Sequence, residues 1–395
     1  MLVGMGAIST DIYLPSLPSI AKEFSSNTAT VQLTLSVFMI AFAVSQLVYG
    51  PISDRFGRRP ALIGGMVVYL VASLGCAMAG SIEILIIARF FQALGACAGP
   101  SVARAVVRDI FGRDRSAKVL AYMGTAMALA PVLGPVLGGY LQIWVGWQAN
   151  FAVMAALGSI SLIGVLFLLR ETNVNKDSSA TKLSHAIRNY ADLVADRRYI
   201  GYVLCSTFAF CGLFSFISAS SFVFIGLIGL APNIYGMCFA VVAGGYMAGT
   251  FIAGRFTTQL GIDPLVRLGT FIIMVAGTLM MAFVMVGYMT VSTLLAPMII
   301  YMFGFGLMHP NAMAGAIGPQ VKRVGAASAL LGFIQLGSAS GVGVTVGHAL
   351  RDNATPMVIV IFLSGIASFA AFLLLVRPTE HSRPADTDYD KTGTI

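Results

Sequence analysis

Runs of about 20 predominantly apolar residues recur along the whole chain and alternate with shorter polar segments. A helix of that length crosses a hydrocarbon core about 30 Å thick. None of the runs alternates apolar and polar residues as a membrane strand does, so the pattern predicts helices rather than a β-barrel. Twelve membrane spans are predicted, at residues 1–21, 31–50, 60–80, 82–103, 118–142, 148–170, 199–224, 233–256, 266–287, 291–313, 325–349 and 356–376.

One polar segment is much longer than the others and separates the predicted spans into two sets of six. It is charged and polar throughout, which is typical of a linker between two halves. The predicted fold class is therefore an all-α membrane protein with twelve transmembrane helices in two six-helix halves. The expected divisions are an N-terminal half at 1–170, a linker at 171–198, a C-terminal half at 199–376 and a polar, disordered tail at 377–395.

The composition supports this class and argues against others. Of the 395 residues, 57% are hydrophobic and only 10% are charged, whereas a soluble domain carries about 25% charged residues. The net charge of +8 would suit a nucleic-acid partner, but Lys and Arg lie in short loops between apolar runs, so none is expected. The five cysteines lie inside apolar runs without histidines at metal-ligand spacing, and we expect neither a metal nor another cofactor.

The distribution of basic residues predicts the orientation of the chain. If the first helix runs from the cytoplasm outwards, 20 of the 24 Lys and Arg residues fall in cytoplasmic segments, as the positive-inside rule requires. We therefore expect a multi-pass protein of the cytoplasmic (inner) membrane with both termini in the cytoplasm. The first span is barely long enough to cross, so either later loops orient the protein or the natural chain begins upstream of Met1; no cleavable signal peptide is expected.

A lone carboxylate interrupts the first span, in the stretch STDIYLPSLP at residues 9–18. Asp11 is the only acidic residue well inside a predicted span, where a charge costs roughly 2.5–3.5 kcal/mol. Desolvation favours the protonated form of a carboxyl group and a nearby cation favours the charged form, so a group balanced between the two exchanges protons near neutrality. A proton-coupled carrier needs that property. Two structural alternatives remain: a hydrogen bond to the backbone beside Pro15, or a fixed ion pair with Arg89.

The hairpin between the second and third spans reads GPISDRFGRRP, residues 50–60, and is here named the switch loop. Its glycines permit close backbone approach and a tight turn, and its acid can accept hydrogen bonds from the arginines. The alternative is a basic loop that only satisfies the positive-inside rule. The second half carries a degenerate copy at 253–269, which favours a duplicated plan. The residues of interest are Gly50, Asp54, Arg55, Gly57, Arg58 and Arg59, with Gly254, Arg255, Gly261 and Arg267 in the copy.

Two further motifs lie in the fourth and fifth spans. Arg89 lies about 10 Å from the outer end of its span, at 1.5 Å per residue, and is followed by Gln92 and Gly95 on nearly the same face. This indicates a buried polar site, although the arginine could instead snorkel to the interface. In ALAPVLGPVLGG, prolines that remove helix hydrogen bonds alternate with glycines that make a flat face. Those residues, Pro131, Gly134, Pro135, Gly138 and Gly139, could also be only a kinked packing groove.

These motifs resemble those of the major facilitator superfamily. In that family the switch loop bears on the change between inward-open and outward-open states, and Arg-x-x-Gln-x-x-Gly is associated with proton coupling. Gly-Pro-x-x-Gly-Gly resembles the signature of its antiporters. The sequence STDIYLPSLP, together with the switch loop and VRDIF at 107–111, is similar to the Bcr/CflA-type multidrug resistance transporters.

The resemblance implies proton-coupled efflux of drugs or other small molecules by alternating access. Asp11, with Arg89 and Gln92, would exchange a proton for substrate, and the first-span prolines would bend the helix there. The expected partners are a small-molecule substrate, protons and the lipid bilayer, and a monomer is expected. Candidate cavity-lining residues, each of which could equally make an interhelical hydrogen bond, are Tyr13, Gln32, Gln46, Tyr122 and Gln335; His309, before Pro310, is expected at a kink where a loop begins.

Two other functions fit these motifs less well than drug export does. A proton-coupled uptake carrier on the same fold is possible in principle, but the motif in the fifth span argues against it. A membrane-embedded enzyme or receptor would need a catalytic or metal cluster at one membrane face, and the sequence has no paired acids, no His-rich site and no nucleophile with a base. The protein is therefore expected not to be an enzyme.

Overall fold

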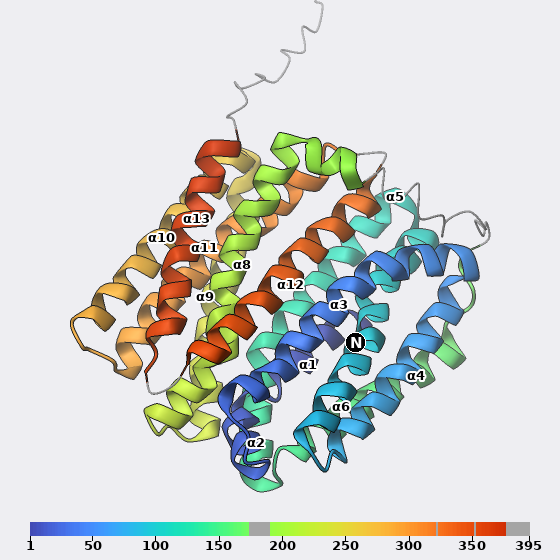
Figure 1. Ribbon diagram of the computed structural model, residues 1–395. Coiled ribbons are helices and arrows are strands. Elements are labelled where there is room, and N and C mark those ends of the chain that lie inside the picture. The colour runs from blue at the N-terminus through green and yellow to red at the C-terminus, as the bar shows by residue number, and fades with distance from the viewer. Residues whose placement is uncertain (174–189, 321–322, 351–352, 377–395) are drawn as a thin grey trace, which may run out of the picture.

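The computed structural model describes residues 1–173, 190–320, 323–350 and 353–376. The predicted tail and most of the predicted linker, residues 174–189, lie outside this part of the chain, as do the side chains of residues 112–118, 120, 121, 125, 126 and 128. The described chain is almost entirely helical (Figure 1). The helices after the first segment are α3 (Thr28–Phe56), α4 (Arg58–Ala77), α5 (Ile82–Trp144), α6 (Gln148–Leu168), α8 (Arg197–Ser221), α9 (Pro232–Leu260), α10 (Ile262–Met285), α11 (Val291–Ile317), α12 (Val324–Ala349) and α13 (Thr355–Leu375).

Eleven segments within the described residues are long and apolar enough to cross a membrane. They correspond to the predicted spans from the second to the twelfth, so the all-α membrane fold is confirmed. The ends of the helices differ from the predicted ends by up to about six residues in either direction, because caps as well as hydrophobicity fix where a helix ends. For example, the Asn27 side chain accepts a hydrogen bond from the Thr30 N–H at the start of α3.

Helix α5 contains two of these segments, Ile82–Phe111 and Tyr122–Trp144. Two separate helices were predicted here, at 82–103 and 118–142, but helical hydrogen bonding continues across the connection. A straight helix of 63 residues would be about 95 Å long. Instead the chain turns back within α5. Gly99 contacts Leu2 and Gly134 contacts Asp11, so two points 35 residues apart in α5 lie beside two points only nine residues apart in the first segment.

The first segment is present where it was predicted, but it is not one helix. Short 3₁₀ turns at Leu2–Gly4 and Leu14–Ser16 alternate with helices α1 (Met5–Asp11) and α2 (Leu17–Glu23). Pro15 and Pro18 have no N–H to donate to the preceding turn, which explains why the α-helix stops after Asp11. The residues beside the break, Ile12, Tyr13 and Leu14, are almost completely buried among the other helices.

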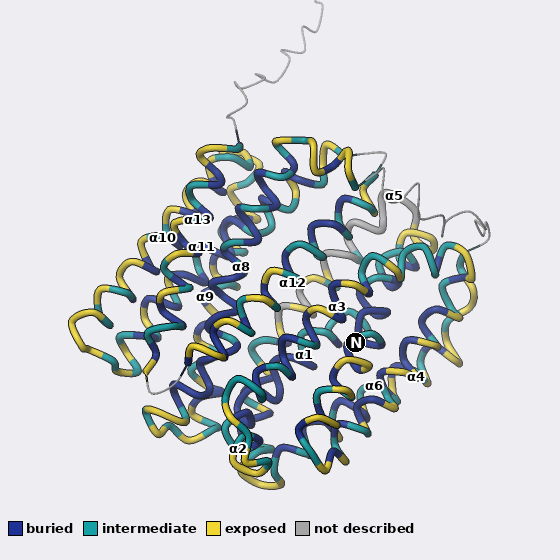
Figure 2. The backbone as a smooth tube through the Cα atoms, in the orientation of Figure 1, coloured by how far each residue is buried: buried dark blue, intermediate teal, exposed yellow. Residues whose placement is uncertain are grey.

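The helices form two groups that correspond to the two predicted halves. In Figure 1, α8 to α13 lie to one side and α1 to α6 to the other, and α3 and α12 run side by side between them. Helices α5 and α9 form a second contact between the halves. Figure 2 shows buried residues where helices face one another and exposed residues along the outer faces, which are apolar and suited to lipid.

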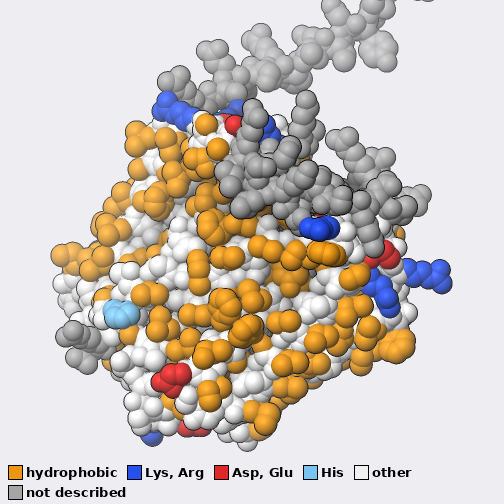
Figure 3. Space-filling model, turned by 45° about the vertical axis from the view of Figure 1, so that its right-hand side comes forward, with side chains coloured by type: hydrophobic (Ala, Val, Ile, Leu, Met, Phe, Trp, Pro, Cys, Tyr) orange, Lys and Arg blue, Asp and Glu red, His pale blue; other side chains and the backbone are white. Residues whose placement is uncertain are grey.

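The two ends of the bundle differ in charge. The basic end is defined by the arginines at the start of α4, α8 and α12 and at the ends of α3 and α9; Lys22 lies at the opposite end. In Figure 3, Lys and Arg gather at the upper and right-hand edges, and apolar side chains cover the region below them. This separation agrees with the predicted positive-inside pattern.

Several close contacts between the halves lie toward the end opposite the basic end. There, Gln32 and Ser36 of α3 lie against Gly347 and Gly343 of α12. Hydrogen bonds connect Ser218 Oγ to Gln32 Oε1 (3.1 Å) and Ser340 Oγ to the Ser36 carbonyl (2.8 Å). Contact between α3 and α12 continues as far as Gln46 and Gly332.

Candidate coupling site

Asp11 is the last residue of α1, at the break in the first segment. Its residue is 4% exposed, so the carboxylate lies inside the bundle. Thr10 Oγ1 donates to Asp11 Oδ1 at 3.0 Å and also lies 2.8 Å from the Ala7 carbonyl oxygen. Among the described residues, no ion pair includes Asp11, so the predicted alternative of a fixed pair with Arg89 is wrong for this conformation. The backbone alternative beside Pro15 is also not seen in the described part.

Glycines of α5 bring that helix directly against Asp11. A Cβ at Gly134 would lie 3.2 Å from the Asp11 Cβ, and one at Gly138 would collide with the carbonyl oxygen of Ile12. The adjacent Gly139 lies against Pro232 at the start of α9. The proline- and glycine-rich motif of α5 is therefore a packing groove. One side of it packs against the broken first segment, which carries Asp11, and the other side packs against the C-terminal half.

Two prolines of the same motif, Pro131 and Pro135, lie inside α5. The backbone at Pro135 contacts Gly236 of α9, so this helix approaches the C-terminal half closely at two successive turns. Tyr235 of α9 also lies near enough to Asp11 to interact with it electrostatically, and its hydroxyl is 2.8 Å from Ser220 Oγ. Asp11 thus lies where the two halves meet.

Arg89 occupies a separate buried site in the N-terminal half. Its Nη1 donates to the Ser9 carbonyl (2.9 Å) and to Gln92 Oε1 (2.6 Å), and its Nε to the Thr34 carbonyl (3.5 Å). The guanidinium carbon lies 4.4 Å from the ring centre of Tyr13 and 4.3 Å from that of Phe38. Arg89 is fully buried, so the predicted polar site is confirmed and the snorkelling alternative is wrong. Its Nη2 has no hydrogen-bond partner.

The sequence predicted Asp11, Arg89 and Gln92 as one site, and the structure arranges them on different faces of the first segment. Ser9 and Tyr13 face Arg89, which lies in the first membrane segment of α5. Asp11, two residues from each, instead faces Gly134 in the second membrane segment of α5 and lies near Tyr235 of α9. Gln92 is on the Arg89 side, where its Nε2 donates to Ser73 Oγ at 2.8 Å. The link between the two charges is the backbone at Ser9, next to the Thr10 hydroxyl that binds Asp11.

The switch loop is held by a network at the basic end. Arg58 binds Asp54 (2.5 Å), Asp109 of α5 (3.1 Å) and Ser53 Oγ (2.6 Å), so the predicted contact between the loop's acid and an arginine is confirmed. Gly57 has a φ of +110°, which a glycine adopts without strain, and a Cβ there would collide with Glu171. At Gly50, by contrast, no atom of the described residues lies within 4 Å of an added Cβ, so the close approach expected there is not seen in this part of the chain.

The other arginines of the switch loop have different contacts. Arg59 Nη2 donates to the Leu166 carbonyl of α6 at 2.9 Å. The Arg55 guanidinium lies over the Phe56 ring, 5.2 Å from its centre. Arg58 and Arg59 thus connect the loop to Asp109, near the end of the first membrane segment of α5, and to the end of α6.

Sequence reasoning missed two acids in this network. Asp109 lies in VRDIF, a stretch that indicated the family but no contact with the switch loop. Glu171 lies three residues after the end of α6. Glu171 accepts hydrogen bonds from the backbone N–H groups of Arg58 (2.9 Å) and Arg59 (3.2 Å), the otherwise unsatisfied donors at the start of α4. Slight burial acts to raise the pKa of Glu171, but hydrogen bonds from the Asn173, Arg58, Arg59 and Thr172 N–H groups together hold it below the ordinary value.

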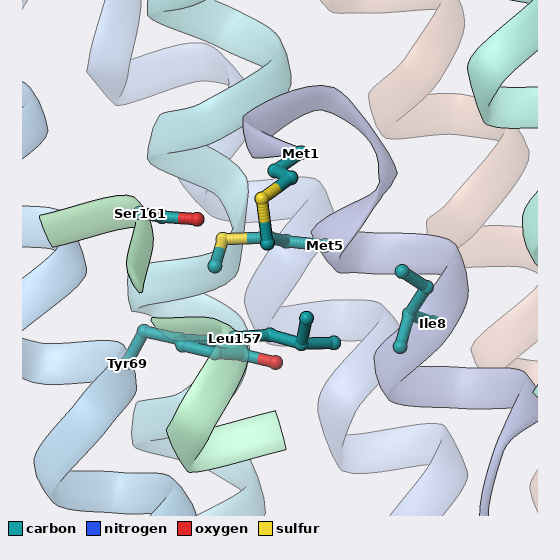
Figure 4. A pocket seen from close by; sticks show the side chains of 6 residues that line it. All are labelled: Met1, Met5, Ile8, Tyr69, Leu157 and Ser161. Atoms are coloured by element: carbon teal, nitrogen blue, oxygen red, sulfur yellow. The ribbon is translucent and has the colours of Figure 1, made fainter. Parts of the chain in front are cut away.

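The candidate cavity residues mostly make interhelical hydrogen bonds. Tyr13 pairs with Thr34 (3.0 Å), Gln32 with Ser218, and Gln335 with Ser206 (3.4 Å). Gln46 Oε1 is buried without a partner, and Tyr122 is 65% exposed. Two cavities lined by described residues are small and do not include Asp11. One of about 30 Å³ is shown in Figure 4, and one of about 130 Å³ lies between Ile40, Ala41, Val44, Phe90 and Leu94.

The expectation for His309 was wrong. It is not where a loop begins but inside α11, eight residues before the helix ends at Ile317. Pro310 lies within the same helix without ending it. The imidazole is hydrogen-bonded and stacked on a phenylalanine, as described below.

Comparison with known proteins agrees with this architecture. Within the described residues, eleven membrane-length helices in two halves, with a buried acid where the halves meet, are typical of a multi-pass membrane transporter. Residues 1–342 match the Major Facilitator Superfamily, and the chain belongs to that superfamily. It is not an enzyme.

Three similar proteins illustrate the relationship. The chain is 30% identical over 379 residues to the uncharacterized MFS-type transporter YdgK of Bacillus subtilis, covering 95% of this chain and 94% of that protein. It is 29% identical to a bicyclomycin resistance protein homolog of Haemophilus influenzae, covering 94% of each. The fold is similar to that of the xylose transporter XylE from E. coli in a partially occluded inward-open conformation, with a TM-score of 0.73 and 14% sequence identity. The match covers 94% of this chain and 96% of XylE.

Proposed function

We propose that the protein exports drugs or other small molecules in exchange for protons. The two halves would alternately expose a central binding region to each side of the inner membrane, with the basic end and both termini in the cytoplasm. Asp11 binds substrate when deprotonated and is neutralised when the region opens outwards, so proton binding releases substrate there. The protein works as a monomer and needs no cofactor, because the proton gradient drives it.

One observation carries this proposal: a buried carboxylate with a single hydroxyl donor lies at the meeting point of the two halves. A permanently ionised group there would be expected to have a charged partner or several donors. Among the described residues Asp11 has neither, and movement of α5 relative to α9 would change its surroundings. The relative named for bicyclomycin resistance supports export as the direction of transport.

The energetics permit this exchange. One proton crossing 100 mV supplies about 2.3 kcal/mol, and each pH unit adds about 1.4 kcal/mol. Together these sustain a gradient of roughly a few hundredfold for a neutral substrate at one proton per molecule.

Asp11→Asn tests the proposal in inverted membrane vesicles. The variant should insert normally but lose drug-induced proton release, because the amide has the same shape and cannot take up a proton. Glu83→Gln is the matched control, since Glu83 is exposed in the first turn of α5. Undiminished drug/proton exchange by Asp11→Asn would contradict the role given to Asp11.

A resistance panel identifies the substrate. The protein is expressed in a pump-deficient host and challenged with bicyclomycin, phenicols, sulfonamides, tetracyclines and cationic dyes. Export predicts raised resistance to at least one compound, lost in Asp11→Asn. Accumulation of labelled compound inside energised cells would instead indicate an uptake carrier.

A further inference from the structure

A polar and aromatic cluster in the C-terminal half has no role in the mechanism above. Ser206 of α8, His309 of α11 and Gln335 of α12 are joined by hydrogen bonds: Gln335 Nε2 to Ser206 Oγ at 3.4 Å, and Ser206 Oγ to His309 Nδ1 at 2.9 Å. The three residues lie 8 to 11 positions from the ends of their helices at the basic end, or about 12–17 Å deep. They belong to different helices, so the packing of the half brings them together.

The direction of these hydrogen bonds leaves one donor and one acceptor free. Ser206 Oγ accepts from Gln335, and its single hydrogen has no other acceptor among the described residues, so it is donated to His309 Nδ1. The neutral ring then carries its hydrogen on Nε2. Within the described part of the chain, neither His309 Nε2 nor Gln335 Oε1 has a hydrogen-bond partner. Unsatisfied groups of this kind at membrane depth are typical of binding sites.

One aromatic ring stacks on the imidazole, and two more lie beside that ring. Phe305 is stacked on His309, with ring centres 4.7 Å apart and planes inclined by 20°. Tyr246 of α9 and Phe210 of α8 lie 5.7 Å and 6.4 Å from Phe305. Phe210, Tyr246 and His309 are only partly buried, so the cluster presents ring surface as well as polar groups.

Two of the helices that carry the cluster also pack against the other half: α12 on α3, and α9 on α5. The side chains that share its hydrogen bonds are a hydroxyl, an amide and an imidazole, without a fixed charge. Such a surface suits a neutral ligand that combines an aromatic ring with hydrogen-bonding groups, rather than a cation.

We propose that Ser206, His309 and Gln335, with the ring of Phe305, form a second substrate subsite that takes neutral aromatic molecules carrying carbonyl, nitro or hydroxyl groups. This subsite rests on the proposed export function and adds a recognition element in the half opposite Asp11. His309 Nε2 donates to an acceptor on the ligand, Gln335 Oε1 accepts from a ligand hydroxyl or amide, and the aromatic rings contact the ligand ring.

The test uses His309→Phe, which keeps a ring on Phe305 and removes both ring nitrogens. Proton release by inverted vesicles is measured against concentration for chloramphenicol, a neutral nitroaromatic, and for bicyclomycin, which has no aromatic ring. The KM for chloramphenicol should rise about five- to tenfold, the effect of one or two lost hydrogen bonds, with Vmax nearly unchanged. The KM for bicyclomycin should stay within about twofold. Gln335→Leu should behave alike, and it decides the question if His309→Phe fails to insert.

His348→Phe is the matched control, because His348 is exposed in α12 and bonds only to the Val344 backbone. Unchanged KM values in both cluster variants would overturn the subsite, as would an equal rise for both compounds or a loss of Vmax alone, which indicate a structural role. If wild type exchanges protons for other compounds but not for chloramphenicol, the subsite fails and the export function stands. If no compound of the resistance panel elicits proton release, both fail.

Discussion

At the scale of single residues, an exposed acid can stabilise the start of a helix by accepting hydrogen bonds from its free backbone N–H groups. Glu171 is solvent-exposed, yet its carboxylate accepts hydrogen bonds from the N–H groups that begin α4. Because its pKa is lowered in the folded protein, the stabilisation is present at neutral pH and is lost as the pH falls through the folded pKa, below the ordinary value of 4.5.

Glu171→Gln should therefore lower the unfolding temperature of the purified protein at pH 7 by a small amount, about 1–2 °C, since exposure weakens the interaction. The difference from wild type should shrink as the pH is lowered below about 4.5, because the wild-type carboxylate then takes up a proton and becomes uncharged, like the glutamine amide. A difference that is constant between pH 7 and pH 3.5 would show that charge on Glu171 is not what holds the switch loop.

At the scale of elements, hydrophobicity predicted eleven of the spans well. Each of these helices is apolar both on the face that packs against other helices and on the face that is exposed to lipid. It could not predict the break after Asp11, which depends on prolines and on packing against α5, or the helical connection within α5. The residues proposed for coupling were also predicted one by one. Their arrangement was not, because only tertiary contacts decide that Ser9 faces Arg89 while Asp11 faces Gly134.

The contact between α5 and the first segment yields a prediction. Gly138→Ala would place a methyl group against the Ile12 carbonyl, so the helices must separate at an expected cost of about 1–3 kcal/mol. We expect a lower unfolding temperature and at least about a tenfold loss of drug/proton exchange in vesicles, since Asp11 moves with Ile12. Gly124→Ala, in the same helix and with no atom of the described residues within 4 Å of an added Cβ, should remain close to wild type. Equal behaviour of the two variants would argue against a tight contact.

At the scale of the whole molecule, the halves are joined by α3 with α12 and by α5 with α9, and several of the close contacts lie toward the end opposite the basic end. Alternating access requires that this end open. Small residues such as Gly343 and Gly347 allow the helices to meet closely without locking side chains together, so the cost of separation stays low.

A disulfide across this seam tests whether opening is needed. A Cβ at Gly347 would lie 3.3 Å from the Gln32 Cβ, close to the mean of about 3.8 Å in disulfides. Oxidation of the Gln32→Cys/Gly347→Cys double variant in liposomes should abolish drug/proton exchange, and a reducing agent should restore it. Each single variant serves as a control for the five native thiols, which are free and mostly buried, and should be insensitive to oxidation. Because α3 and α12 belong to different halves, exchange that continues in the cross-linked protein would mean that transport does not separate them at this end.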